Sequence, residues 1–515
     1  MVHYTDIVVG AGSSGAVIAA RLSEDPTSQV LLIEAGPDYP TTQSLPADVR
    51  DGRYPSMSGH DWGYQAEAVP GREIPLVRGK VVGGTSAINT CLAVRPDPLD
   101  FEDWMSRGID GWSWDDVLPY LIRIEDDQDY GPPLHGKGGP TPVRRWRDEE
   151  LSPLQKAFLQ TSRDLGFPEV PDHNAPGAVG VGPMAQNLVD GMRISTAVAY
   201  LASARKREQL EIRADTLAER IVFEDGRAVG VRIVTDGVSE TVYGDRITVC
   251  TGAVGTPALL MRSGIGAADA LERLGVPVVA DLPGVGENLL DHPTCWVTRK
   301  PRPGVYDESL PVTQVLLQYT APGSEQARDM QLYLFSHIDL NGYAPAVQEK
   351  IGTDKVFMVS AGVERPYSVG RIVVESTDPQ AAPRIEFNFL SHEEDRRRLR
   401  EGMRLADRIA RSEKFELFAS GETVPGPEVI ADDDALDAFM LSTVGTHFHP
   451  VGTAKMGPAS DPLAVVDSRC RVHGVPGLRV ADASVMPVMV RANTNLTCLM
   501  IGERVGDWLM EEGRK

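Results

Sequence analysis

The feature that most constrains the fold is a strand–turn–helix–strand pattern at the start of the chain. An apolar run at residues 6–9 leads into the turn Gly-Ala-Gly-Ser-Ser-Gly at residues 10–15, and a helical stretch follows at residues 16–22. A second apolar run at residues 30–33 ends at the carboxylate Glu34. This order and spacing are typical of a dinucleotide-binding βαβ unit, which predicts a parallel sheet.

Four residues of this unit have separate tasks in holding a dinucleotide. Gly10 permits the tight turn, Gly12 lets backbone amides approach a pyrophosphate, and Gly15 allows the helix to pack closely on the strand. The helix N-terminus attracts the anion, and Glu34, 19 residues after Gly15, is spaced to accept the ribose hydroxyl groups. We therefore expect an adenine dinucleotide here, and the unit alone leaves both a nicotinamide and a flavin cofactor open.

Length and charge narrow the class of protein. The 515 residues exceed one ordinary hydrophobic core, so we expect two domains or one heavily inserted domain. A content of 42% hydrophobic and 24% charged residues is typical of a soluble globular enzyme. The net charge of −22 argues against nucleic acid and anionic membranes as partners.

Cysteine usage and the absence of long apolar runs bear on location. The five cysteines are isolated, with no spacing that suits zinc and no disulfide framework, so we expect no metal site. The first strand begins within six residues of the start, which leaves no room for a signal peptide. No stretch approaches the roughly 18 apolar residues of a membrane-spanning helix. We expect a cytoplasmic protein with no membrane partner.

The rest of the chain predicts further strands and helices. Two alternating strands flank a turn at residues 224–227, and two more short strands are expected at residues 240–243 and 246–250, before the chain rejoins the parallel sheet. A long charged helix is expected from residue 393 to about 412. A strand beginning at residue 478 and a final helix complete the pattern.

These elements predict an α/β fold in which a discontinuous Rossmann-like domain is interrupted by an α+β substrate domain that contains an antiparallel sheet. Residues 37–75 leave the first sheet, and residues 105–205 are interpreted as an insertion over the ligand site. The dinucleotide domain is predicted at residues 1–36, 76–104, 206–295 and 465–515, and the substrate domain at residues 37–75, 105–205 and 296–464.

Six segments, in order along the chain, resemble the glucose–methanol–choline (GMC) family of flavin oxidoreductases. The first is Gly-Lys-Val-Val-Gly-Gly-Thr-Ser-Ala-Ile-Asn at residues 79–89, and the last is Asn-Thr-Asn at residues 493–495. Between them lie residues 252–266, residues 282–292 with Leu-Pro-Gly-Val-Gly-Glu-Asn-Leu, residues 449–453 with His-Pro-Val-Gly-Thr, and residues 478–484.

The resemblance implies that FAD is the cofactor. The residues expected to hold its ADP half are Gly10, Gly12, Gly15 and Glu34. Those expected along the pyrophosphate, the ribityl chain and the flavin ring are Arg78, Gly83, Gly84, Thr85, Asn89 and Asp482. Some relatives attach the flavin to a histidine at the position of Ile88, which has no nucleophile, so we expect non-covalent FAD.

Two residues are expected to perform the chemistry. Oxidising an alcohol with a flavin requires a base for the hydroxyl proton and a polar group near the substrate oxygen, and histidine suits the first task. By resemblance, His449 is the base and Asn493 its hydrogen-bonding partner. His447 is expected to point to the opposite face if its segment is extended. His292 is interpreted as structural or cofactor-adjacent.

The expected reaction is oxidation of a primary alcohol on an aromatic, furan or allylic carbon to the aldehyde, with electrons passed to oxygen. The pattern most resembles the hydroxymethylfurfural and aryl-alcohol oxidase branch of the family, with support from residues 112–114, 129–136 and 493–496. A dehydrogenase that passes electrons to a quinone or another redox carrier, with choline-like substrates included, is the alternative. A non-catalytic flavoprotein or a flavin lyase is the third interpretation. The oligomeric state is left open.

Overall fold

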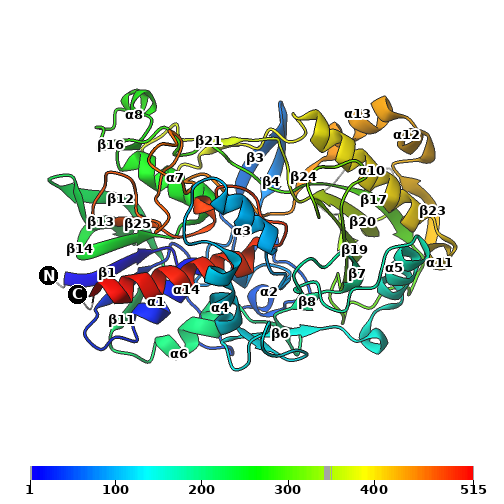
Figure 1. Ribbon diagram of the computed structural model, residues 1–515, viewed down its shortest axis with the longest axis horizontal. Helices are drawn as coiled ribbons and strands as arrows, with labels where there is room; N and C mark the ends of the chain where they lie inside the picture. Colours follow the sequence, from blue (N-terminus) through cyan, green and yellow to red (C-terminus); the bar gives the residue numbers. More distant parts are fainter. Residues whose placement is uncertain (1–2, 341–347, 350, 514–515) are drawn as a thin grey trace.

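The computed structural model describes residues 3–340, 348–349 and 351–513, and two large sheets dominate it. Figure 1 shows one sheet, with β1 (His3–Val9) and β14 (Val238–Val249), toward one end of the long axis. The other sheet, with β17 (Pro293–Pro301) and β20 (Lys355–Val363), lies toward the opposite end. The predicted α/β fold, with one mixed and one antiparallel sheet built from separated segments, is confirmed.

The predicted βαβ unit forms as expected. Strand β1 pairs in parallel with β2 (Val30–Ile33), with Asp6 opposite Val30 and Val9 opposite Ile33, and α1 (Ser13–Leu22) connects them. The next strand outward is β11 (Leu210–Arg213), also parallel. The carboxyl ends of these strands therefore meet at one edge of the sheet, which is where nucleotide ligands bind in such folds.

Strand β14 corrects one prediction. The two short strands expected at residues 240–243 and 246–250 are a single strand, which pairs antiparallel with β13 (Arg227–Thr235) and then parallel with β1 and β25 (Leu478–Val480). The expected break fell at Gly244. A side chain there would approach Ile7 to about 3.0 Å, so this glycine marks close packing between strands and not a turn.

The final helix, α14 (Thr494–Gly513), packs along α1 (Figure 1). Gly502 lies where a side chain would contact the backbone of Ser14 at 2.8 Å, so the two helices can approach closely. At their N-termini, Ser13 Oγ donates to Asn495 Oδ1 over 2.8 Å. The two helix N-termini are thereby joined beside the sheet edge.

The second sheet has a hydrophobic core on one face and the cavity on the other. Successive side chains along each strand point to these two faces in turn. The sheet has the order β23-β17-β20-β19-β18-β7, and α10 (Glu393–Ala410), predicted from its charge pattern, covers one face. Cys295 and Val359 point to the core under this helix, whereas their neighbours Thr294 and Ser360 line the cavity on the other face. The elements of this sheet that are used below are β18 (Val315–Tyr319), β19 (Met330–Asp339), β7 (Gly180–Pro183) and β23 (Ala419–Val424).

The two segments that leave the first sheet, residues 37–75 and 105–205, differ in how they relate to the cavity. Strands β3 (Tyr64–Val69) and β4 (Arg72–Leu76) form a separate four-stranded sheet with β21 (Arg371–Val373) and β22 (Arg384–Glu386), as an excursion should. The expectation that residues 105–205 cover the ligand site is wrong, since none of them lines the cavity. Their helix α5 (Pro153–Asp164) packs on the second sheet, on its core side.

Many charged side chains of residues 105–205 form ion pairs inside the protein. This explains why the segment does not line the cavity. The buried Arg145 guanidinium pairs with Asp127 at 2.8 Å and with Asp172 at 2.7 Å. Such paired charges hold loops together and are not free to bind a ligand. Among the helices in the described part of the chain, none combines the length and the apolar character needed to cross a bilayer.

Candidate active site

A cavity of about 980 Å³ takes its walls from both sheets. One end is formed by the glycine turn after β1, and the walls continue past the N-termini of α1 and α14 to the inner face of the second sheet. The cavity therefore connects the predicted dinucleotide site with the predicted catalytic residues. A cavity of this size at the carboxyl ends of parallel strands suits a dinucleotide with space for a substrate.

At the dinucleotide end, Gly10, Gly12 and Glu34 line the cavity as predicted. The Glu34 carboxylate accepts hydrogen bonds from the backbone amides of Ala11 at 3.0 Å and Gly36 at 2.9 Å, which fix its position. Burial raises the pKa of Glu34 to about 7. Gly15 does not line the cavity: a side chain there would lie 1.9 Å from the Gly10 carbonyl oxygen, so its task is packing.

A second glycine turn completes this end of the cavity. The amide of Gly83 donates to the Ala11 carbonyl over 2.8 Å, and a side chain on Gly84 would lie 2.6 Å from the Gly12 Cα atom. Gly84 and Thr85 line the cavity, and Gly83 lies behind them with a φ of +104°. The two turns are therefore in direct contact and form one cradle, which only glycine permits at these positions.

Three further predicted cofactor residues line the cavity: Arg78, Asn89 and Asp482. Asp482 has a second task, because its carboxylate accepts from the backbone amide of Gly252 at 2.8 Å and from Thr256 Oγ1 at 2.6 Å, at the start of α7 (Gly252–Arg262). Glycine turns without side chains, helix N-termini and a fixed carboxylate make a site that fits FAD.

The structure brings His449 and Asn493 together at the cavity wall. Asn493 Nδ2 lies 3.2 Å from His449 Nε2, although the residues are 44 positions apart in the sequence. His449 lies between the second sheet and the cofactor cradle, and Asn493 directly precedes α14. The predicted pair therefore meets at the wall that a substrate would contact.

A buried carboxylate that the sequence analysis did not assign holds the histidine segments together. Asp291 accepts from the backbone amides of His292 at 2.7 Å and His449 at 3.1 Å, and from Thr446 Oγ1 at 2.5 Å. Burial raises the pKa of Asp291 to about 7. Because one carboxylate fixes the backbone of both histidines, their rings are held at a defined separation.

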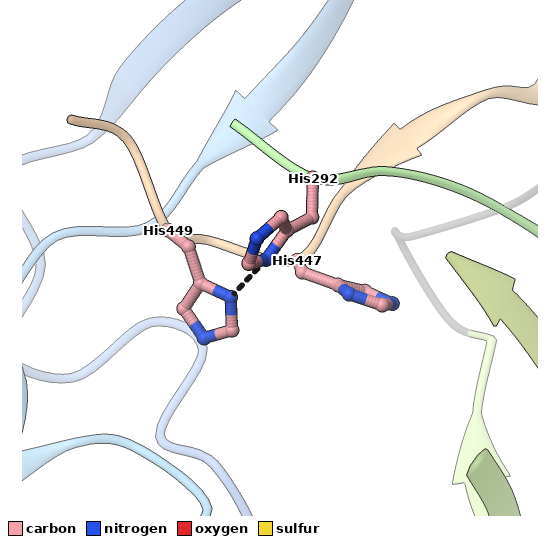
Figure 2. A group of neighbouring side chains, drawn as sticks. All are labelled: His292, His447 and His449. Atoms are coloured by element: carbon pink, nitrogen blue, oxygen red, sulfur yellow. Dashed lines mark hydrogen bonds between the residues drawn. The ribbon is translucent and has the colours of Figure 1, made fainter. Parts of the chain in front are cut away.

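His292 is fully buried and contacts His449, which agrees with the structural or cofactor-adjacent position interpreted from the sequence. Its Nδ1 lies 3.0 Å from Nδ1 of His449 (Figure 2). Its Nε2 lies 2.9 Å from the Val490 carbonyl oxygen. A carbonyl only accepts, so Nε2 of His292 carries the proton and its Nδ1 accepts from His449. Nε2 of His449 is then free of a proton and can act as a base.

Burial and the neighbouring imidazoles keep these histidines neutral. Burial lowers the pKa of His292 to about 3, and burial with the nearby His292 lowers the pKa of His449 well below its usual value. Since both nitrogens of His292 are engaged in hydrogen bonds, we interpret the group as a hydrogen-bonded chain and not as a metal site. A neutral, oriented imidazole is the form that accepts a proton.

The position of His447 differs from the expectation. Phe448 has a φ of +63°, so the segment is not extended, and His447 and His449 both contribute to the cavity wall with ring centroids 6.1 Å apart. The two ring nitrogens of His447 are nevertheless buried and lack a hydrogen-bond partner within the described residues. The ring packs against Gly362, where a side chain would lie 2.4 Å from the His447 Cε1 atom.

Comparison with known proteins places the chain in a family. Residues 4–294 and 366–502 match two family models, each described as GMC oxidoreductase. The chain is 37% identical to an uncharacterized GMC-type oxidoreductase of Rhodococcus erythropolis, with 98% of each chain covered. It is 34% identical to an oxygen-dependent choline dehydrogenase of Photobacterium profundum, over 98% of this chain and 93% of the relative.

A solved structure agrees over the whole length. The fold matches that of pyridoxine 4-oxidase from Mesorbium loti with a TM-score of 0.90 and 32% identity, covering 99% of both chains. The family expected from the sequence motifs is confirmed by these matches. The chain therefore belongs to the GMC oxidoreductase family and is an FAD-dependent enzyme that acts on alcohols.

Proposed function

We propose that the protein oxidises a primary alcohol on an aromatic or other unsaturated carbon to the aldehyde, with His449 as the base and oxygen as the electron acceptor. The observation that carries the proposal is the position of His449 Nε2 on the cavity wall, 3.2 Å from Asn493 Nδ2. A hydroxyl group between these atoms would donate to the imidazole and accept from the amide.

His449, His292 and Asn493 have separate roles in removing the hydroxyl proton of the alcohol. His449 takes the hydroxyl proton at Nε2, and the hydrogen bond from its Nδ1–H to His292 stabilises the charge that the ring acquires. The Asn493 amide supports the substrate oxygen as negative charge develops on it. FAD, when bound, would accept the hydride from the carbinol carbon. Gly10, Gly12 and Glu34 are the proposed holders of its ADP half.

The walls near His449 support a flat, apolar substrate. Side chains from three strands of the second sheet and from the histidine segment provide aromatic and thioether surface, and they are Trp296, Tyr333, Phe335, Met358 and Phe448. Aromatic rings favour stacked or edge-to-face contact with another ring. The similarity to pyridoxine 4-oxidase is consistent with an alcohol carried on an aromatic ring.

A choline-like substrate is the second candidate, because choline dehydrogenases are among the relatives and aromatic walls also attract a quaternary ammonium. A cation would gain from a free carboxylate. Among the described residues, the carboxylates that line the cavity beyond the cofactor cradle are Glu308 and Asp339, and Glu308 pairs with the Lys355 ammonium. That pairing weakens the case for a cationic substrate.

Matched alcohols separate the two candidates. We would mix the purified enzyme anaerobically with benzyl alcohol, its saturated counterpart cyclohexylmethanol, choline and the uncharged choline isostere 3,3-dimethylbutan-1-ol, and follow bleaching of the flavin. Fast bleaching by benzyl alcohol alone is expected. Faster bleaching by choline than by its isostere would favour the second candidate, and no bleaching by any alcohol would favour a flavoprotein with another role.

The acceptor needs a separate measurement. Air added to the bleached enzyme should restore the flavin colour within the turnover time if oxygen is the acceptor. Slow recovery in air, together with fast recovery on addition of a quinone or a redox dye, would identify a dehydrogenase.

A further inference from the structure

A buried carboxyl group lies beside His292 and His447 and has no assigned task. Glu364 follows β20 and is 1% exposed, and neither of its oxygens has a hydrogen-bond partner within the described residues. Its Oε2 lies 3.3 Å from Nε2 of His292, and its Oε1 lies 3.8 Å from Nδ1 of His447. A buried polar group without partners is costly, so its retention between two imidazoles calls for a physical reason.

The surroundings of Glu364 keep it neutral at rest. Burial, with the carboxylates of Asp100, Asp291 and Asp329, raises the pKa of Glu364 well above its usual value. Burial lowers the pKa of His447 to about 4. The carboxyl group therefore carries one proton, while both neighbouring imidazoles are neutral.

The possible proton positions are then restricted. Nε2 of His292 already carries a proton, so the Glu364 proton belongs on Oε1, which has Nδ1 of His447 as an acceptor at 3.8 Å. The Nε2–H of His292 has the Glu364 Oε2 atom at 3.3 Å as a second neighbour beside the Val490 carbonyl at 2.9 Å. The order of the groups is then His449 Nδ1 next to His292, His292 Nε2 next to Glu364 Oε2, and Glu364 Oε1 next to His447. Figure 2 shows the three imidazoles of this group, His292, His447 and His449.

We propose that Glu364 and His447 are positioning residues that extend the His449–His292 pair into a four-group proton chain, which moves the proton of the alcohol away from the reacting atoms. This deepens the proposed function and rests on His449 as the base. Such a chain spreads the positive charge over several groups, so removal of the hydroxyl proton becomes more favourable.

Each step balances without any electron transfer. The alcohol O–H bond breaks as the bond from the proton to His449 Nε2 forms, and the Nδ1 proton of His449 passes to His292 Nδ1. The Nε2 proton of His292 passes to Glu364 Oε2, and the Oε1 proton of Glu364 passes to His447 Nδ1. For the last two steps, the contacts of 3.3 Å and 3.8 Å must shorten to about 3 Å.

The variant Glu364→Gln tests the chain because an amide keeps the size and both hydrogen-bonding edges but does not relay a proton. We expect unchanged flavin content and melting temperature, an unchanged KM for the alcohol, and a rate of flavin reduction lowered about 10- to 100-fold, the value of a lost charge-assisted hydrogen bond. The acid limb of kcat/KM should move to lower pH, since the protonated base loses stabilisation. Glu375→Gln, in an exposed pair with Arg384, is the matched control and should behave as wild type.

Infrared spectroscopy gives a readout independent of turnover. The difference between wild type and Glu364→Gln near neutral pH should contain the carbonyl band of a protonated carboxyl group, and Glu375→Gln should retain that band. If Glu364→Gln does not fold, His447→Phe removes the end of the chain and carries the same kinetic expectations.

A wild-type rate and a wild-type acid limb in Glu364→Gln would overturn the proton chain. The absence of the protonated carboxyl band would do the same. Failure of the proposed function is recognised separately, because an active His449→Ala variant removes the base itself. An inactive His449→Ala variant beside a wild-type-like Glu364→Gln variant would reject only the extension through Glu364.

Discussion

His292 and His449 define each other's chemistry through one hydrogen bond of 3.0 Å. The Val490 carbonyl fixes the proton of His292, and this in turn fixes the proton of His449 on the side away from the cavity. The residue types were predictable from the sequence motifs, and so were His449 and Asn493. The contact between His292 and His449 could not be predicted, because the two residues are 157 positions apart and no local sequence pattern encodes a contact at that separation.

The pH dependence follows from the lowered pKa of His449. The sequence suggests activity falling below about pH 6.5, the ordinary value for histidine. Burial favours the neutral ring, so the base stays competent at lower pH and the acid limb of kcat/KM should lie below that value. A profile of kcat/KM between pH 4 and 8 measures it. An acid limb at or above about pH 6.5 would show that the ring is solvated in the working enzyme.

Contacts between elements explain why two glycine turns are needed. Each turn was recognised as a motif, but the sequence does not reveal that Gly84 touches Gly12 and closes one cradle. The same limit applies to β14, where a glycine between two apolar runs resembled a turn. In both cases the glycine serves contact between strands or loops that are distant in sequence, so local patterns mislead.

Gly84→Ala should open the cradle. A methyl group at Gly84 would lie 2.6 Å from the Gly12 Cα atom at a φ of +52°, so the two turns must separate, at a cost of about 1–3 kcal/mol. The flavin content of the purified variant should fall, as measured by the absorbance ratio of flavin to protein. Gly63→Ala is the control, since its φ is +73° and no atom lies within 4 Å of the added methyl. Equal flavin loss in both variants would assign the effect to backbone strain alone.

Across the whole molecule, the cavity depends on both sheets, because the first supplies the cofactor cradle and the second supplies the substrate walls. The sequence predicted this division and the assembly of each sheet from separated segments. The exact domain boundaries remain a prediction. The placement of residues 105–205 could not be predicted, because their buried ion pairs look like solvated charges in the sequence.

Non-covalent binding of FAD is expected to stabilise the whole fold. Ile88 lines the cavity and offers no nucleophile for attachment, so acid precipitation should release all of the flavin into the supernatant. Because FAD binds the folded state, an excess of 100 times Kd should add about 2.7 kcal/mol to the free energy of unfolding and raise the melting temperature. Flavin that remains with the precipitate would indicate a covalent link.

The most direct test of the account is the rate of anaerobic flavin reduction by benzyl alcohol in wild type and in His449→Ala. The account predicts that the variant retains its yellow flavin and its fold but reduces it about 10²- to 10⁴-fold more slowly, because the base for the hydroxyl proton is lost. A variant that is reduced as fast as wild type would contradict the assignment of His449, and with it the mechanism proposed for this cavity.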